Sequence, residues 1–85
     1  MTAHWYVPLP RPVEAVQWNG DIDDLPSKWR ELDMFRLDGD DILIVRTLDG
    51  LASAEVGDYI VRGTVNEFYP VKRLIFEGKY REQES

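Results

Sequence analysis

Aromatic and basic side chains that could bind a ligand gather in the last third of the chain. A ring can stack on a nucleobase, and the planar fork of an arginine donates paired hydrogen bonds to a phosphate. The candidates for such a nucleotide-binding site are Arg62, Tyr69, Arg73, Tyr80 and Arg81. In a chain of 85 residues these rings more often form the core, with the basic side chains facing water. The pattern therefore allows two interpretations, a small-ligand site or a packed aromatic core.

The chain has few of the side chains that carry catalysis or hold metal ions. His4 is the only histidine, and it lies in a proline-rich segment where nothing positions it beside a nucleophile. Because there is no cysteine, disulfides, thiolate metal sites and thiol nucleophiles are excluded, which fits a reducing compartment. Gly57 and Gly63 lack the Lys-Ser or Lys-Thr pair of a phosphate-binding loop. We predict that the protein is not an enzyme and uses no cofactor and no metal.

Three aspartates surround a glycine in the middle of the chain, at Asp38, Asp40 and Asp41. Carboxylates are ligands for Ca²⁺ or Mg²⁺, but this segment lacks the spacing and the closing glutamate of an EF-hand loop. Asp-Gly-Asp between two β-rich runs is typical of a hairpin turn. The same three side chains are candidates for a protein interface, because a row of carboxylates can imitate nucleic-acid phosphates toward a basic partner.

The charge is acidic overall and uneven along the sequence. The net charge is −6, which disfavours direct nucleic-acid binding because phosphate neutralisation requires a basic surface. Residues 21–41 carry eight acidic and three basic side chains, whereas residues 59–81 carry two acidic and five basic ones. This separation is typical of ordinary solvated faces, or of a dipolar surface that stacks on copies of itself. No apolar run approaches the roughly 20 residues of a membrane span, and no export signal is evident, so we expect no membrane association.

The first twelve residues are predicted to form an extended, proline-rich arm. Pro8, Pro10 and Pro12 remove backbone donors and favour a polyproline-like conformation. Trp5 and Tyr6 are too apolar for a disordered tail, so we expect the arm to dock back on its own domain or, as the alternative, to reach a neighbouring subunit. Residues 13–81 are predicted to form a single α+β domain, and residues 82–85 a frayed polar tail.

Alternating apolar residues and turn signals predict a β-rich domain. The first strand, at residues 13–18, directs Val16 and Trp18 toward the core. Further strands are predicted at residues 34–37, 42–48, 51–56, 59–62 and 68–69, with a short edge strand at residues 79–81. Residues 38–41 and the dipeptide Asp49-Gly50 are the predicted hairpin turns.

Two short helical segments complete the prediction. Pro26 begins a helix at about residues 25–32, on which Leu25, Trp29 and Leu32 share one apolar face. A helical turn at about residues 71–76 is expected to end at Gly78. The predicted fold class is therefore α+β, with a small antiparallel β-sheet or partly closed barrel of about five strands, one short helix and a C-terminal helical turn.

Four segments of the chain resemble a family of short phage and prophage proteins. They are residues 12–20 (PVEAVQWNG), 56–63 (VGDYIVRG), 67–70 (EFYP) and 75–80 (IFEGKY). The resemblance implies an accessory role in an infected bacterium, located in the host cytoplasm or, as an alternative, in the virion. It transfers no catalytic or ligand residue, because the shared positions look structural: glycines at turns, a proline at a strand end and aromatic residues for packing.

These observations lead to one functional hypothesis and two alternatives. The first is a non-catalytic phage accessory protein that acts through a host or phage protein partner, or through assembly into a homo-oligomer. Its interface candidates are Trp5, Tyr6, Asp38, Asp40 and Asp41. The alternatives are a nucleotide-sequestering module and an acidic mimic of nucleic acid that inhibits a host enzyme.

Overall fold

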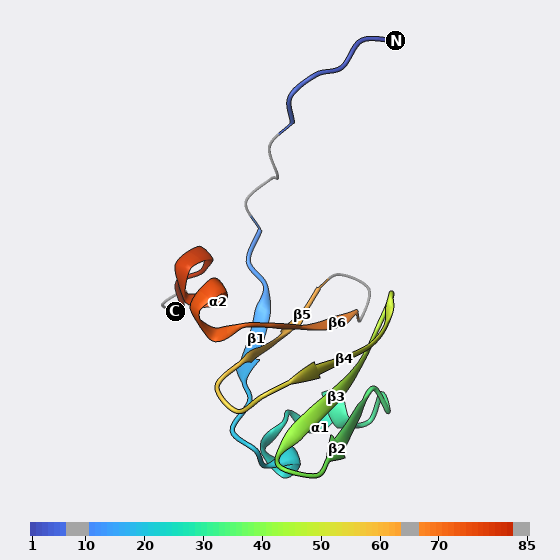
Figure 1. Ribbon diagram of the computed structural model, residues 1–85, viewed down its shortest axis with the longest axis vertical. Coiled ribbons are helices and arrows are strands. Elements are labelled where there is room, and N and C mark those ends of the chain that lie inside the picture. Colours follow the sequence, from blue (N-terminus) through green and yellow to red (C-terminus); the bar gives the residue numbers. More distant parts are fainter. Residues whose placement is uncertain (7–10, 64–66, 83–85) are drawn as a thin grey trace.

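The computed structural model describes residues 1–6, 11–63 and 67–82, and it confirms the predicted α+β class. Six antiparallel strands form two three-stranded sheets, rather than the single sheet of about five strands that we predicted, and they do not close into a barrel (Figure 1). Sheet A contains β1 (Glu14–Gln17), β5 (Tyr59–Arg62) and β6 (Phe68–Val71), in that order. Sheet B contains β2 (Phe35–Asp38), β3 (Ile42–Thr47) and β4 (Gly50–Ala54). The helices are α1 (Ser27–Arg30) and α2 (Arg73–Lys79), and a 3₁₀ turn spans Ile22–Asp24.

Sheet A joins segments that lie far apart in the sequence. Val61 of β5 lies opposite Ala15 of β1 on one side and opposite Tyr69 of β6 on the other. The Gly63 amide donates to the Glu67 carbonyl at 2.8 Å, and hydrogen-bonded pairs alternate with non-bonded ones along an antiparallel ladder. Pro70 therefore occupies a non-bonded pair with its ring nitrogen at the outer edge of β6, a position where a strand tolerates proline.

Sheet B is a meander of three consecutive strands. The predicted turn at residues 38–41 is present, and Asp40 and Asp41 both adopt positive φ, 62° and 63°. In the second turn Thr47 pairs with Gly50, so the loop is Leu48-Asp49, one residue earlier than we predicted. Of the predicted pair Asp49-Gly50, only the glycine has positive φ, at 119°. The Thr47 hydroxyl donates to the Gly50 carbonyl at 2.8 Å and accepts the Asp49 amide at 3.1 Å, which stabilises this shifted turn.

The core lies between the two sheets and the α1 segment, and the predicted burial of Trp18 and Trp29 is confirmed. The Trp29 ring packs against Phe68 with the ring centroids 5.0 Å apart, and Phe35 meets Phe68 edge to face at 4.9 Å. Both indoles keep a hydrogen bond when buried, which such polar tips require. Trp18 Nε1 donates to the Asp41 carbonyl at 2.7 Å, and Trp29 Nε1 donates to the Glu14 carboxylate at 3.1 Å.

The helical segments differ from the prediction at their ends. The predicted helix at residues 25–32 is only Ser27–Arg30, because Asp33 turns the chain away with a φ of 58°. Leu25 is buried as expected, but Leu32 lies beyond the helix and is exposed, so it is not part of the apolar face.

The C-terminal helix is longer than the predicted turn at residues 71–76. It runs from Arg73 to Lys79 and continues through Gly78, which we expected to stop it. Tyr80 then takes extended backbone angles as the residue that ends the helix, and the predicted edge strand at residues 79–81 does not form.

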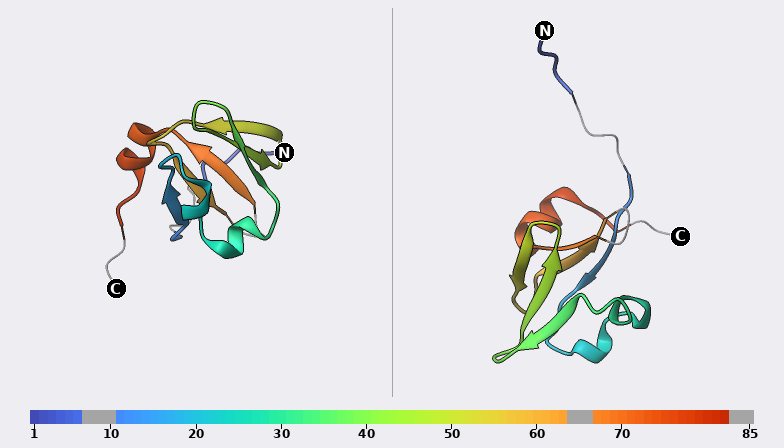
Figure 2. Two further views of the ribbon diagram at one scale, coloured as in Figure 1. Left: turned by 90° about the horizontal axis from the view of Figure 1, so that it is seen from below. Right: turned by 90° about the vertical axis from the view of Figure 1, so that its right-hand side faces the viewer.

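Residues 1–6 of the N-terminal arm lie away from the domain (Figures 1 and 2). Trp5 and Tyr6 have relative exposures of 101% and 85%, so the prediction that the arm docks back on its own domain is wrong. Pro8 and Pro10 lie outside the described residues, as does most of the predicted polar tail at residues 82–85. No helix in the described ranges is long and apolar enough to cross a bilayer.

Candidate protein-interaction site

Each sheet has two outer strands, and three of these four edges are protected against pairing with another chain. Natural edge strands commonly carry charged residues or proline, which discourage added strands. β1 carries Glu14, β2 carries Arg36, and β6 carries Pro70 at its outer edge. β4, with the sequence Gly50–Ala54, contains neither a charged residue nor a proline. In the described part of the chain β4 pairs only with β3, so it is the one edge of the four with neither kind of protection.

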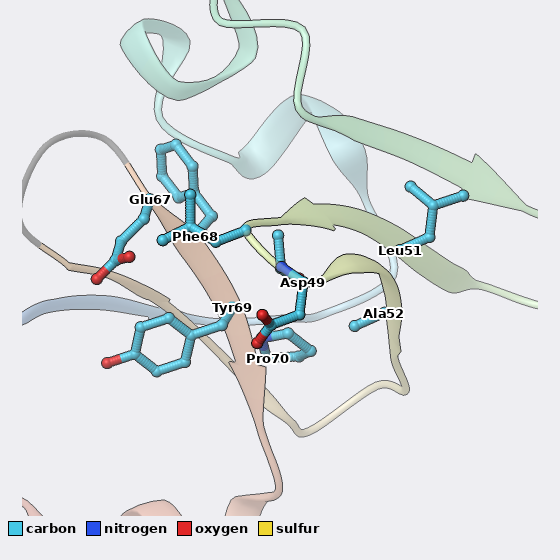
Figure 3. Close-up of a pocket in the computed structure, with 9 residues that line it drawn as sticks. Asp49, Leu51, Ala52, Glu67, Phe68, Tyr69 and Pro70 are labelled. Carbon is cyan, nitrogen blue, oxygen red and sulfur yellow. The ribbon is translucent and has the colours of Figure 1, made fainter.

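A groove of about 430 Å³ runs between β4 and β6, and we call it the β4–β6 groove (Figure 3). One wall is formed by residues 67–70, at the outer edge of sheet A. The opposite wall is formed by residues 47–49 and 51–52, from the β3–β4 hairpin. The volume falls within the range of about 300–1,000 Å³ that is typical of ligand sites.

The β4–β6 groove combines apolar walls with negative charge. Leu48 and Leu51 line it and are exposed. Its charged lining residues are Asp49 and Glu67, both acidic. Burial raises the pKa of Tyr69, and the neighbouring Tyr80 and Glu67 raise it further, so the Tyr69 phenol stays protonated at neutral pH and can donate a hydrogen bond. The groove therefore suits an extended segment that is apolar or basic.

A second groove, which we call the outer groove, has a volume of about 240 Å³. It is lined by residues 33–36, 44, 46 and 51, and its basic side chains are Arg36 and Arg46. Leu51 lines both grooves, so the two depressions meet at β4. A strand added to β4 would therefore have an acidic apolar surface on one side and a basic apolar surface on the other.

Sequence reasoning missed this site. Its signal is the uncharged run Gly50–Ala54 between the exposed residues Leu48 and Val56. We interpreted that run as an ordinary strand of a meander, because the sequence alone does not show that β4 ends a sheet or that β6 lies beside it.

The five residues predicted to bind a nucleotide do not form one site. Arg62 pairs with the Glu14 carboxylate at 3.3 Å, and Arg73 begins α2, where its amide donates to Asp58 at 3.4 Å. Tyr69 lines the β4–β6 groove and interacts electrostatically with Tyr80. Arg81 is exposed beyond the end of α2. The structure thus brings Tyr69 and Tyr80 together, and neither groove is lined by any of the three arginines.

The other aromatic residues of this region dock α2 on sheet A. Phe76 stacks on Tyr59 at 4.1 Å between ring centroids and on Tyr80 at 4.7 Å. The Tyr59 hydroxyl donates to the Glu77 carboxylate at 2.8 Å. This hydrogen bond raises the pKa of Tyr59, and burial adds to the effect. Of the two interpretations of the aromatic residues, a ligand site or packing, packing therefore holds for Tyr59, Phe76 and Tyr80.

Asp58 is a buried carboxylate that we did not single out in the sequence; its relative exposure is 7%. It accepts the Glu55 amide at 3.0 Å, the Lys72 ammonium at 3.2 Å and the Arg73 amide at 3.4 Å. Burial alone would raise the pKa of Asp58, but the Glu55 amide, Lys72 and the Arg73 amide together hold it below its ordinary value. Asp58 thus ties the turn before β5 to the start of α2, which is a structural role.

The acidic interface candidates lie at the other end of sheet B. Asp38, Asp40 and Asp41 form the β2–β3 turn, whereas the β4–β6 groove begins at the β3–β4 turn, at the opposite end of β3. Asp38 Oδ1 accepts the Gly39 amide at 3.0 Å, as expected for a turn residue. Across residues 1–6, 11–63 and 67–82, no group of three or more histidine or acidic side chains is arranged to hold a metal ion.

Comparisons of the chain with protein-family models, with curated protein sequences and with solved structures find no match. The interpretation of the site therefore depends on its geometry and chemistry. The features that carry it are the unprotected edge of β4, the grooves on its two sides and the exposed aromatic arm.

Proposed function

We propose that the protein is a non-catalytic interaction module that binds an extended segment of a protein along β4. The observation that carries the proposal is that the β4 edge carries no charged residue or proline and is bordered by the β4–β6 groove. In this mode of recognition, the backbone of the bound segment adds a strand to the sheet and supplies affinity through main-chain hydrogen bonds. Alternate side chains of the segment enter neighbouring pockets and supply specificity.

The exposed leucines of the site support the same proposal. Leu48 and Leu51 are among the large apolar side chains that face solvent, and both line the β4–β6 groove. Exposed apolar residues that cluster beside a groove are typical of protein-binding surfaces. The resemblance to short phage proteins supports an accessory role in an infected cell, in the host cytoplasm or in the virion.

The proposal can be tested with peptides selected from a random library for binding to the purified protein. We expect the selected peptides to shift the backbone amide resonances of β4 in NMR spectra and to lose affinity for the variant Leu51→Glu. Leu74→Glu is the matched control, because Leu74 on α2 is about as exposed as Leu51, 75% against 68%. Peptides that bind both variants equally, or that shift resonances away from β4, would contradict the proposal.

A further inference from the structure

We infer that the segment bound along β4 is the N-terminal arm of a second copy of this chain. The inference rests on the proposed function and identifies the partner. Its first support is the arm itself, in which Trp5 and Tyr6 are fully or almost fully exposed. Each such ring removes roughly 150–250 Å² from water when it docks, so two adjacent rings at the end of an extended segment form a strong anchor.

The charges of the arm and the groove are complementary. Arg11 is the only charged side chain in residues 1–12, so the arm carries +1 and residues 13–85 carry the remaining −7 of the net charge of −6. The charged residues of the β4–β6 groove are Asp49 and Glu67. An acidic groove attracts a basic segment and repels acidic segments that would compete for the same site.

The backbone of the arm matches β4 in length. Residues 2–6 contain no proline, so each of the alternate amides that would face β4 in an added strand can donate to its edge, which is also five residues long. Pro8, Pro10 and Pro12 follow and lack amide donors, which limits the added strand to the part before them. The segment that can pair with β4 is therefore limited to the residues before Pro8.

Two adjacent rings suit the two grooves on either side of β4. Consecutive side chains of a strand point to opposite faces, so Trp5 and Tyr6 in an added strand point to opposite sides. One ring would enter the β4–β6 groove, between Leu48 and Tyr69. The other would reach the outer groove, where Arg36 and Arg46 can contact the face of an aromatic ring.

The geometry favours a donated arm over other occupants. A whole sheet edge from another molecule would meet β6, which stands beside β4 as the second wall of the groove. A single extended segment is narrower than a sheet edge, so β6 obstructs it less. Trp5 and Tyr6 do not cover the site of their own chain, because both are exposed and residues 1–6 lie away from the domain (Figure 1). Reciprocal exchange of arms between two copies gives a closed dimer with two identical contacts.

The test compares the wild-type chain with an arm variant, Trp5→Ala/Tyr6→Ala, and a groove variant, Leu51→Glu, by native mass spectrometry and sedimentation velocity. We expect the wild type to self-associate as its concentration rises from micromolar to near millimolar. Each variant should weaken self-association by about tenfold or more, as expected when an anchor is lost. Leu74→Glu should self-associate like the wild type. All of these positions are exposed, so the variants should fold, which thermal unfolding can verify.

Mixing the two defective variants gives the decisive result. The groove variant retains an intact arm and the arm variant retains an intact groove, so an equimolar mixture should form a mixed complex that neither variant forms alone. A wild type that stays monomeric over the whole range, or a mixture without a mixed complex, would overturn the inference. If the Trp5 indole resonance of a monomeric wild type shifted on Leu51→Glu substitution, the occupant would be the arm of the same chain. If the inference were overturned but selected peptides still bound β4, the proposed function would hold and only the identity of the partner would be wrong.

Discussion

The docking of α2 depends on the carboxylate of Asp58, and replacing it with asparagine tests this dependence. Asparagine has the same size, but its amide nitrogen cannot accept the hydrogen bonds that Oδ2 accepts from Glu55 and Lys72. A buried hydrogen bond to a charged group contributes about 1.5–3 kcal/mol. Lys72 is 61% exposed, so its share is at most about 1 kcal/mol. We expect Asp58→Asn to lower the free energy of unfolding at neutral pH by about 2–3 kcal/mol, and the Tm by roughly 10–20 °C.

The effect of Asp58→Asn should depend on pH in a defined direction. The pKa of Asp58 in the folded state lies below its ordinary value of 3.8, because the donors that face it outweigh the effect of burial. The stabilisation from the carboxylate is therefore complete above the unfolded pKa and is lost as the pH falls through the folded pKa. The difference in unfolding free energy between wild type and variant should be constant near neutral pH and should shrink below about pH 4.

Urea unfolding followed by tryptophan fluorescence measures this difference, because Trp18 and Trp29 are buried in the folded state. Asp40→Asn is the control, since Asp40 is an exposed turn residue and asparagine tolerates its positive φ. The control should change stability by no more than about 0.5 kcal/mol. An Asp58→Asn variant as stable as the control, or a difference that persists unchanged in acid, would refute the reasoning.

Three further predictions concern the core, the α2 contact and one turn. Trp29→Ala should lower the free energy of unfolding by about 3–5 kcal/mol, enough to remove much of the cooperative transition in a thermal melt followed by circular dichroism; a melt like that of the wild type would contradict the burial of this ring. Glu77→Gln should lower the pKa of Tyr59 toward its ordinary value in a spectrophotometric titration, and an unchanged titration would mean that their hydrogen bond is absent. Gly57→Ala should cost about 1–3 kcal/mol because φ is 101° there, whereas Gly39→Ala, which has no positive φ and open space around it, should be nearly neutral in the same melts.

The parts of the fold that depend on neighbouring residues were predictable from the sequence. Alternating side chains located the strands of sheet B, and the turn residues at 38–41 located the first hairpin, because hairpin pairing is set within a few residues. The burial of Trp18 followed from the alternation in the first strand, and that of Trp29 from the helical spacing of apolar residues. The second turn was displaced by one residue, since the Thr47 hydroxyl stabilises a loop that the Asp49-Gly50 dipeptide does not indicate.

The parts that depend on distant residues were not predictable. Periodicity does not show that β1 pairs with β5, nor that β6 lies beside β4, so the two sheets and the β4–β6 groove were missed. Gly78 has a low helix propensity, but the stacking of Tyr80 on Phe76, four residues apart, favours continuation of the helix through it. We expected the arm to dock on its own domain because its rings are apolar, but Trp5 and Tyr6 are exposed. The acceptor that we propose for them belongs to a second chain, which a single chain does not contain.

The order of the strands has a consequence for how the chain folds during synthesis. β1 is made first, but its only partner in the described structure, β5, is the fifth strand to leave the ribosome. The three strands of sheet B pair with their immediate neighbours and can form in the meantime, since local contacts require little loop closure. β1 can pair only after Arg62 has emerged, so a chain that stops before Tyr59 would leave both edges of β1 unpaired. Such a truncated product would be a target for aggregation or proteolysis, and folding of the whole domain therefore depends on synthesis of the last third of the chain.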